Sequence, residues 1–377
     1  MEKEQNKPKI LIFSLAYAPF IGGAEIAVQE ITKRLVVPPV GGFEFDVITA
    51  NLDGKQEERE VMNGVTIYRV GKTKWSKFFY PWLANKKAAE LNKNNNYQIV
   101  WGVLEFWAGW AALKFKEKFP QVKYVLTMQS GDSDAFVFGH TFFWYWRYRQ
   151  IFIKADYIQV ISNWLAKRAR KYGYKGEIGV VPNGVIINSQ QSAINKNKDQ
   201  KIILTVSRLV KKNGVADLIK AMKILDAKLM VVGTGKLKEK LKKLAQKNEM
   251  ADKVEFIGRV PYEELGAYYG KADVFCRPSL SEGLGNSFLE AMAAGVPVIA
   301  TPVGGIPDFL KEGETGWFCE PKNSKSIAEK IEYVLDEKNK EEVARVVANA
   351  KKMVMEKYTW EKVAGQMREI INNLLSS

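Results

Sequence analysis

Apolar residues occur along this chain in short runs that alternate with longer stretches of helical spacing. In the first half, the runs predict strands at residues 9–14, 45–49, 98–103, 123–128, 157–161 and 178–181. In the second half, they predict strands at residues 202–207, 229–233, 254–258, 273–276 and 296–300. Between them lie helical patterns such as A-E-I-A-V-Q-E-I-T-K-R-L at 24–35. Strands that alternate with helices are typical of a parallel, doubly wound sheet.

The pattern is interrupted once by a polar stretch, I-N-S-Q-Q-S-A-I-N-K-N-K-D-Q, which predicts a linker at 187–200. A length of 377 residues is long for one hydrophobic core and suits two domains. We therefore expect an N-terminal α/β domain at 1–186 and a second α/β domain at 201–359, followed by a terminal helix at 360–377. The segment V-P-P-V-G-G at 37–42 is expected to be an irregular insertion.

The most informative segment is S-L-S-E-G-L-G-N-S-F-L-E-A-M-A-A, which begins at Ser279. It places Glu282 on a glycine-containing loop and Glu290 about one turn into the helix that follows. Glycines such as Gly285 let the backbone turn tightly and approach a ligand closely. Asn286 or Ser287 is expected to cap the helix, whose N-terminal amides and dipole favour phosphate. One carboxylate can then face a sugar and the other a ribose.

Two further loops carry groups that suit a diphosphate. The segment S-R-L-V-K-K-N-G at 207–214 follows a predicted strand and places Arg208 and Lys212 at the carboxyl end of the sheet. Gly22 and Gly23 lie between the first strand and the first helix, where backbone amides can approach a phosphate. This loop is not G-x-G-x-x-G, so a nicotinamide cofactor is not indicated.

The E-x7-E spacing of Glu282 and Glu290 resembles the signature of the family 4 retaining glycosyltransferases, and matching segments follow in the same order along nearly the whole chain. The resemblance implies the α/β GT-B fold, with two Rossmann-like domains facing each other across a deep cleft. It implies that the first domain binds the acceptor, that the second binds a nucleotide sugar, and that the C-terminal helix packs back on the first domain.

The resemblance also implies a role for individual residues. Glu290 would hold the ribose, Glu282 the hydroxyls of the donor sugar, and Arg208 with Lys212 the diphosphate. The other positions carried over as donor-binding are Gly22, Gly23, Gly233, Val260, Gly285, Asn286 and Ser287. The implied partners are a UDP- or GDP-sugar donor and a glycan or lipid-linked acceptor, as in polysaccharide biosynthesis.

The chain departs from the family pattern at several positions. Asn213 stands where a lysine is usual, so Lys212 is expected to substitute. Gln129 stands where many relatives have a histidine near the sugar, and glutamine cannot titrate. This suits a front-face mechanism in which the departing phosphate takes the acceptor's proton and the protein supplies positioning and charge. Asp132 is the candidate for holding an acceptor hydroxyl, and His140 is expected to have a structural role.

The composition suits a cytoplasmic protein and leaves open whether the protein contacts a membrane. The start of the chain is charged and shows no secretory signal, and two cysteines, Cys276 and Cys319, suit a reducing cytoplasm. The formal net charge of +15 does not accompany any nucleic-acid-binding motif. Two segments, 72–82 and 142–154, mix bases with aromatic residues, which is typical of an anionic membrane surface and equally of core packing with a basic rim. Neither a metal nor another cofactor is expected, since no D-x-D motif directly ends a strand of the first domain and the chain has one histidine.

Two other classes of function remain open from the sequence. One is an enzyme of the same fold, either a UDP-sugar epimerase or a sugar phosphorylase. The epimerase would need acid–base groups around the sugar, and the phosphorylase a pyridoxal-phosphate lysine, and no such residues are evident. The other is a non-catalytic basic adaptor for membranes or nucleic acid, which would give Glu282 and Glu290 no purpose. The donor's base and sugar and the acceptor's identity are not predicted.

Overall fold

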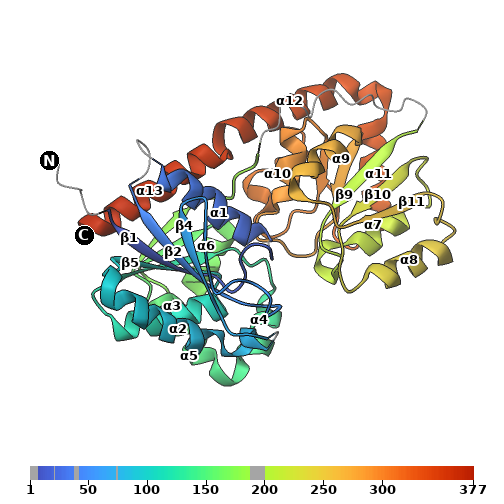
Figure 1. The fold of residues 1–377 in the computed structure, drawn as a ribbon. Helices are drawn as coiled ribbons and strands as arrows, with labels where there is room; N and C mark the ends of the chain where they lie inside the picture. Colours follow the sequence, from blue (N-terminus) through green and yellow to red (C-terminus); the bar gives the residue numbers. More distant parts are fainter. Residues whose placement is uncertain (1–6, 21, 38–41, 74, 187–199) are drawn as a thin grey trace. The chain divides into compact units, whose positions relative to one another are not determined.

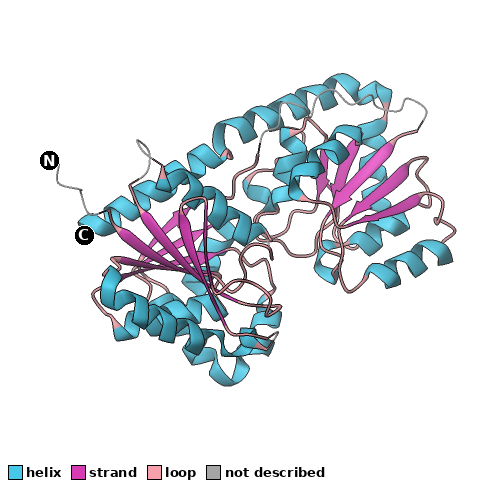
Figure 2. Cartoon of the chain, in the orientation of Figure 1, coloured by secondary structure: helices cyan, strands magenta, loops and turns pink. Residues whose placement is uncertain are grey.

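The computed structural model describes residues 7–20, 22–37, 42–73, 75–186 and 200–377, and it divides the chain into two compact units (Figure 1). Unit 1 comprises Met1–Gly184 together with Trp360–Ser377, and unit 2 comprises Val185–Thr359. Each unit has its own sheet with helices packed on it (Figure 2). The predicted linker at 187–200 lies outside the described residues except for Gln200, as do 38–41 of the predicted insertion.

Unit 1 is built on an eight-stranded sheet with the order β3-β4-β2-β1-β5-β6-β7-β8. Its strands are β1 (Lys9–Phe13), β2 (Glu44–Ala50), β3 (Arg59–Met62), β4 (Val65–Val70), β5 (Ile99–Val103), β6 (Lys123–Met128), β7 (Tyr157–Val160) and β8 (Glu177–Val180). All neighbours pair in parallel except β3 and β4, which form an antiparallel hairpin. The central strand β1 is buried from Ile10 to Phe13, as expected for a parallel strand covered on both faces.

Helices cover both faces of this sheet. They are α1 (Gly23–Val36), α2 (Ser76–Asn95), α3 (Trp107–Lys118), α4 (Asp134–Thr141), α5 (Tyr145–Ile153), α6 (Asn163–Lys171) and α13 (Trp360–Ser376). Figure 1 shows α2, α3 and α5 together on one face and α1 with α13 on the other. The C-terminal helix α13 packs on α1, and Arg34 of α1 forms an ion pair with Glu361 of α13 at 2.8 Å.

Unit 2 is built on a six-stranded parallel sheet with the order β11-β10-β9-β12-β13-β14. Its strands are β9 (Ile202–Val206), β10 (Lys228–Val232), β11 (Val254–Gly258), β12 (Val274–Arg277), β13 (Val298–Ala300) and β14 (Trp317–Phe318). Its helices are α7 (Val215–Ala221), α8 (Lys238–Lys247), α9 (Leu265–Lys271), α10 (Asn286–Ala293), α11 (Ser324–Leu335) and α12 (Lys340–Lys357). The strand order reverses next to β9, and in open α/β sheets ligands bind beyond the carboxyl ends of strands at such a point.

Candidate functional site

In unit 2, three loops meet at the carboxyl ends of the adjacent strands β9, β12 and β13. The amide of Leu280 donates to the carbonyl of Lys212 at 2.6 Å, and the amide of Gly305 donates to the carbonyl of Glu282 at 3.2 Å. A Cβ at Gly214 would lie 1.8 Å from the Pro278 carbonyl oxygen, so only glycine allows this approach. The structure therefore brings the loop of the predicted diphosphate-binding residues against the loop of Glu282.

A buried arginine that the sequence did not single out organises this loop. Arg277, the last residue of β12, forms an ion pair with Glu282, and its Nη1 donates to the hydroxyl of Ser287 at 2.8 Å. Its Nε donates to the hydroxyl of Ser279 at 3.2 Å, and its guanidinium lies 4.2 Å from the ring centre of Phe288. The side chains of Arg277 and Glu282 are only 7% and 17% exposed, so the pair is largely withdrawn from water. Arg277 thereby fixes the direction of the Glu282 carboxylate.

The second predicted carboxylate, Glu290, has its own partner. The hydroxyl of Tyr269 in α9 donates to Glu290 Oε2 at 2.7 Å. Burial raises the pKa of the Glu290 carboxyl, while the Tyr269 hydrogen bond and the charge of Arg277 oppose that rise. Burial and the neighbouring carboxylate raise the pKa of the Tyr269 hydroxyl well above its usual value, so Tyr269 remains a donor at neutral pH. One oxygen of Glu290 is thus held by the protein.

The N-terminus of α10 differs from the prediction in one detail. The residue that precedes the helix is Gly285, with φ of 93° in the left-handed region, and no side chain caps the helix there. The predicted caps do not act as such: Asn286 is the first helical residue, and the Ser287 hydroxyl accepts from Arg277. A Cβ at Gly285 would lie 2.7 Å from Arg277 Nη2, which explains why glycine is needed beside the arginine.

The basic loop after β9 exposes Arg208 and leaves Lys212 half-buried. Asn213, which replaces the usual lysine, is buried, and its side-chain amide donates to the carbonyl of Arg208 at 2.6 Å. This residue therefore shapes the loop. Gly233 has φ of 126°, and a Cβ there would lie 1.9 Å from the Ser207 carbonyl oxygen, so the loop after β10 packs on the same edge. Val260 follows β11 and is half-buried.

In unit 1, the predicted residues lie at the ends of β1 and β6. Gly22 and Gly23 are exposed at the start of α1, and the Gly22 amide donates to Glu25 Oε2 at 2.8 Å. The first amide expected to face a phosphate is therefore bound by a side chain of its own helix. Gln129 follows β6, and its Oε1 accepts from Asn183 Nδ2 at 3.1 Å. Asp132 Oδ2, a little further on, accepts from the Ser130 hydroxyl at 2.8 Å.

His140, expected to be structural, is exposed on α4. Its Nδ1 lies 2.8 Å from the carbonyl oxygen of Phe136, and the two rings lie 4.0 Å apart. These contacts are local to α4, and the absence of a chemical role stays a prediction.

The aromatic-basic segments 72–82 and 142–154 carry exposed rings. Trp75, Phe79 and Phe143 are 61%, 62% and 92% exposed, so this part of both segments faces outward and is not core. Within the described ranges, no helix is long and apolar enough to cross a membrane, and no group of three or more His, Cys, Asp or Glu side chains is placed to hold a metal ion. Cys276 and Cys319 are buried free thiols.

Solved structures with the same architecture are GT-B glycosyltransferases. The sucrose-phosphate synthase of Thermosynechococcus elongatus matches with a TM-score of 0.86 and 22% identity, covering 98% of this chain and 100% of that one. HepE of Anabaena, solved in complex with UDP-glucose, matches with a TM-score of 0.77 and 16% identity, covering 97% and 99% of the two chains. This chain therefore has the GT-B fold with two Rossmann-like units.

Sequence comparison identifies the family. The model of the family described as "Glycosyltransferase Family 4" matches residues 21–188, and that described as "Glycosyl transferases group 1" matches residues 187–353. An uncharacterized glycosyltransferase of Methanocaldococcus jannaschii is 31% identical over 400 residues, covering 97% of each chain. The GDP-mannose-dependent alpha-(1-6)-phosphatidylinositol monomannoside mannosyltransferase of Mycobacterium tuberculosis is 28% identical over 245 residues, which is 59% of this chain and 63% of that protein. The chain belongs to glycosyltransferase family 4.

Proposed function

We propose that this glycosyltransferase moves a hexose from a nucleotide-diphosphate sugar to a glycan or lipid-linked acceptor, with retention of configuration at the anomeric carbon. The observation that carries the proposal is the convergence, in unit 2, of Glu282, Glu290 and the Arg208 loop around the N-terminus of α10. Similar proteins support a nucleotide-sugar donor. HepE has been solved with UDP-glucose, and the mycobacterial relative is named for its GDP-mannose dependence.

Each residue of this site has a distinct task in the proposed reaction. Glu290 accepts hydrogen bonds from the ribose hydroxyls with the oxygen that Tyr269 leaves available. Glu282, oriented by Arg277, accepts from hydroxyls of the donor sugar. Arg208 and Lys212 bear the positive charge that stabilises the diphosphate as the glycosidic bond breaks. The backbone at Gly285, Asn286 and Ser287 contacts the sugar or phosphate, and Gly233 and Val260 flank the base.

The proposed mechanism is front-face displacement without a metal or another cofactor. The acceptor oxygen forms a bond to the anomeric carbon on the side from which the nucleoside diphosphate leaves, and the acceptor's proton passes to the departing phosphate oxygen. Unit 1 is proposed to supply positioning: Asp132 holds an acceptor hydroxyl, and the family resemblance implies that Gln129 and the Gly22–Gly23 loop take part in binding the donor. No residue of this set needs to titrate, so Gln129 serves where relatives have a histidine.

The exposed aromatic side chains of unit 1 support a further proposal about location. The two aromatic-basic segments, 72–82 and 142–154, are connected through α3 into one aromatic surface. The ring centre of Trp82 lies 5.4 Å from that of Trp110 in α3, and the ring centre of Trp110 lies 5.7 Å from that of Trp144. Exposed Trp and Phe beside lysines such as Lys77 suit the headgroup region of an anionic bilayer. We propose that the protein is cytoplasmic and contacts the membrane peripherally through this surface.

Titration with UDP and GDP tests the donor site. One nucleotide should raise the melting temperature saturably, since a ligand at 100 times its Kd stabilises the folded state by about 2.7 kcal/mol. Glu290→Ala should abolish the shift, whereas the matched control Glu329→Ala, on the exposed face of α11, should retain it. A non-catalytic adaptor predicts no shift with either nucleotide, and an equal shift in wild type and Glu290→Ala would remove the ribose-binding role.

A further inference from the structure

Unit 1 contains a pocket that the donor site does not use. Its volume is about 410 Å³, within the range of small-molecule sites, and it lies among α3, α4 and α5. Most of the wall is apolar and largely aromatic, contributed by Phe106, Trp107, Trp110, Phe136, Trp144 and Ile151. An apolar ligand should bind most tightly to such a wall, because burial of apolar surface is the dominant favourable contribution to the free energy of association.

The charged residues of the wall, together with the hydrogen-bonding groups of His140, Thr141 and Tyr148, favour an uncharged, hydroxyl-bearing head on that ligand. Asp132, the candidate for holding an acceptor hydroxyl, lines the pocket, and its negative charge disfavours an anionic head. Arg147 also lines the pocket, but Glu117 engages its guanidinium through two bonds of 2.7 and 2.6 Å. The positive charge at the wall is thereby compensated.

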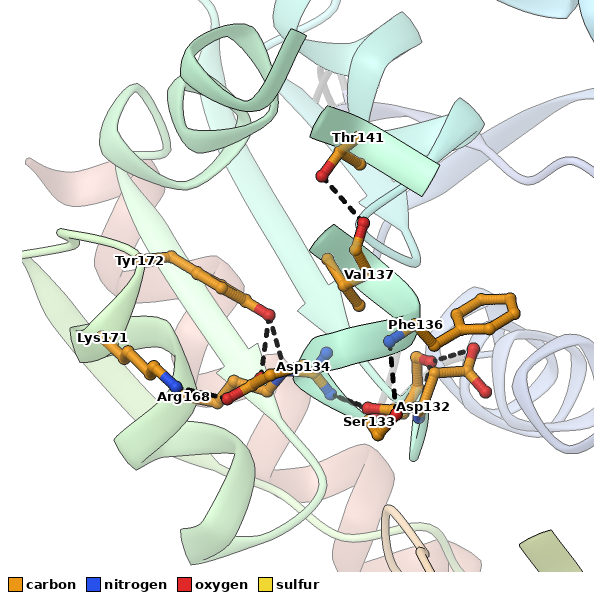
Figure 3. Close-up of polar contacts among 10 residues, drawn as sticks. Asp132, Ser133, Asp134, Phe136, Val137, Thr141, Arg168, Lys171 and Tyr172 are labelled. Atoms are coloured by element: carbon orange, nitrogen blue, oxygen red, sulfur yellow. Dashed lines mark hydrogen bonds and ion pairs between the residues drawn. The ribbon is translucent and has the colours of Figure 1, made fainter. Parts of the chain in front are cut away.

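The wall formed by α4 is anchored to the body of the unit (Figure 3). Asp134, in its first turn, accepts from the Tyr172 hydroxyl at 3.2 Å and pairs with Arg168 and Lys171 of α6. These pairings lower the pKa of the Asp134 carboxyl, the Lys171 hydrogen bond contributing most, so it stays charged at neutral pH. The Ser133 hydroxyl caps the helix by accepting from the Phe136 amide at 3.3 Å. The first turn of α4, which forms part of the pocket wall, is therefore fixed to α6.

The pocket is also continuous with the exposed aromatic surface described above. Trp107 lies 6.3 Å from Phe78, and Trp110 lies 5.4 Å from Trp82, ring centre to ring centre. Phe78 and Trp82 are 44% and 48% exposed. A ligand lying against Trp107 and Trp110 thus adjoins the side chains proposed to contact a bilayer, which is where a lipid would enter.

We propose that this pocket binds the hydrocarbon chain of an amphiphilic acceptor, whose hydroxyl-bearing head lies at Asp132. The inference rests on the proposed function and narrows its acceptor from a glycan or lipid to a molecule with an apolar chain. Each methylene that the pocket buries should tighten binding about fourfold, which is about 0.8 kcal/mol, until the pocket is full.

Calorimetry with glucose and with n-butyl, n-hexyl and n-octyl glucoside, each as a monomer in solution, tests the proposal without a membrane. Affinity should rise about fifteenfold for each two methylenes. Ala108→Phe, on the α3 wall, should fill the pocket and remove this increment. Trp144→Ala, at a partly exposed ring of the wall, should reduce the gain in affinity per methylene. This variant replaces Ala108→Phe in the test if Ala108→Phe does not fold. Asp132→Asn should weaken binding of all three glucosides equally.

The control is Phe143→Ser, an exposed ring that does not line the pocket and should leave the series unchanged. Affinities that are independent of chain length, or an increment that survives both Ala108→Phe and Trp144→Ala, would overturn the inference. UDP and GDP titrated into the same samples separate the two proposals. If a nucleotide binds but affinity for the glucosides does not rise with chain length, the proposed donor site is supported and the proposed lipid pocket is contradicted. If affinity rises with chain length but neither nucleotide binds, the proposed transferase function is contradicted.

Discussion

Breaking the ion pair between Arg277 and Glu282 should destabilise unit 2 strongly, because it leaves a largely buried charge without its partner. We consider Arg277→Met, Glu282→Gln and the double variant. Arg277→Met keeps an unbranched side chain over the Phe288 ring, where the guanidinium lies at 4.2 Å, but leaves the Glu282 carboxylate largely buried and without its cation. Glu282→Gln leaves the guanidinium with its bonds to two serine hydroxyls at 3.2 and 2.8 Å.

The two single substitutions should therefore differ in cost. Removing one member of a buried pair costs about 3–5 kcal/mol, so Arg277→Met should cost about 4 kcal/mol. Glu282→Gln removes one charged hydrogen bond and should cost about 2 kcal/mol. The double variant leaves no buried, unpaired charge and should also cost about 4 kcal/mol, which gives a coupling free energy of about 2 kcal/mol. Arg277→Lys, which keeps the charge but loses the planar fork, should lie between wild type and Arg277→Met.

Native-state hydrogen exchange followed by mass spectrometry can measure these costs in the full chain. Peptides covering β9 and β12 report the free energy of opening unit 2, whereas those covering β1 and β5 should not change and serve as the internal control. A coupling free energy below about 0.5 kcal/mol would refute the reasoning, because that is the value of an exposed pair.

Three further predictions concern the donor site and the exposed aromatic surface. Between the ordinary pKa of a glutamate and the raised pKa of Glu290, the folded state keeps a proton that the unfolded state releases, so stability falls as pH rises through that range. Glu290→Gln should abolish this fall in urea titrations, leave the protein at least as stable at pH 7, and lose nucleotide binding. Arg208→Ala should lower kcat about hundredfold, about 3 kcal/mol, with little change in donor Kd, and a loss confined to KM would contradict a transition-state role. Phe143→Ser with Trp146→Ser should reduce sedimentation with anionic vesicles at low salt, and wild-type protein that stays in the supernatant there would contradict membrane contact.

The sequence was sufficient to predict the two-sheet architecture, because buried parallel strands read as continuous apolar runs. It did not lead to the prediction of β3 and β4, although Asn63-Gly64 between alternating residues is a strong hairpin signal. Both residues have positive φ, 51° and 79°, as a two-residue hairpin turn requires. β3 lacks a clear apolar pattern because none of its residues is buried: Glu60 and Met62 are half-buried, and Arg59 and Val61 are exposed.

The candidate site was predicted in part, because spacing identifies residues on one loop or helix but not their partners from other elements. Glu282 and Glu290 were found by spacing. Tyr269 comes from α9, 21 residues before Glu290, and no local pattern connects the two. Arg277 gave a weak signal, a lone charge that ends the apolar strand V-F-C, and a charge at such a position is expected to have a partner. Asn213, noted as a departure, proved to hold the Arg208 loop through its side chain.

The measurement that tests the central claim most directly is proton NMR of the sugar transferred or released from a nucleotide sugar. A panel of UDP- and GDP-linked α-hexoses is incubated with the enzyme, and the anomeric proton of the product is recorded before mutarotation. The proposed front-face reaction predicts that one donor is consumed, that Arg208→Ala slows its consumption, and that the α-anomer appears first. First appearance of the β-anomer, or consumption of no donor by a protein that binds nucleotide, would contradict the account.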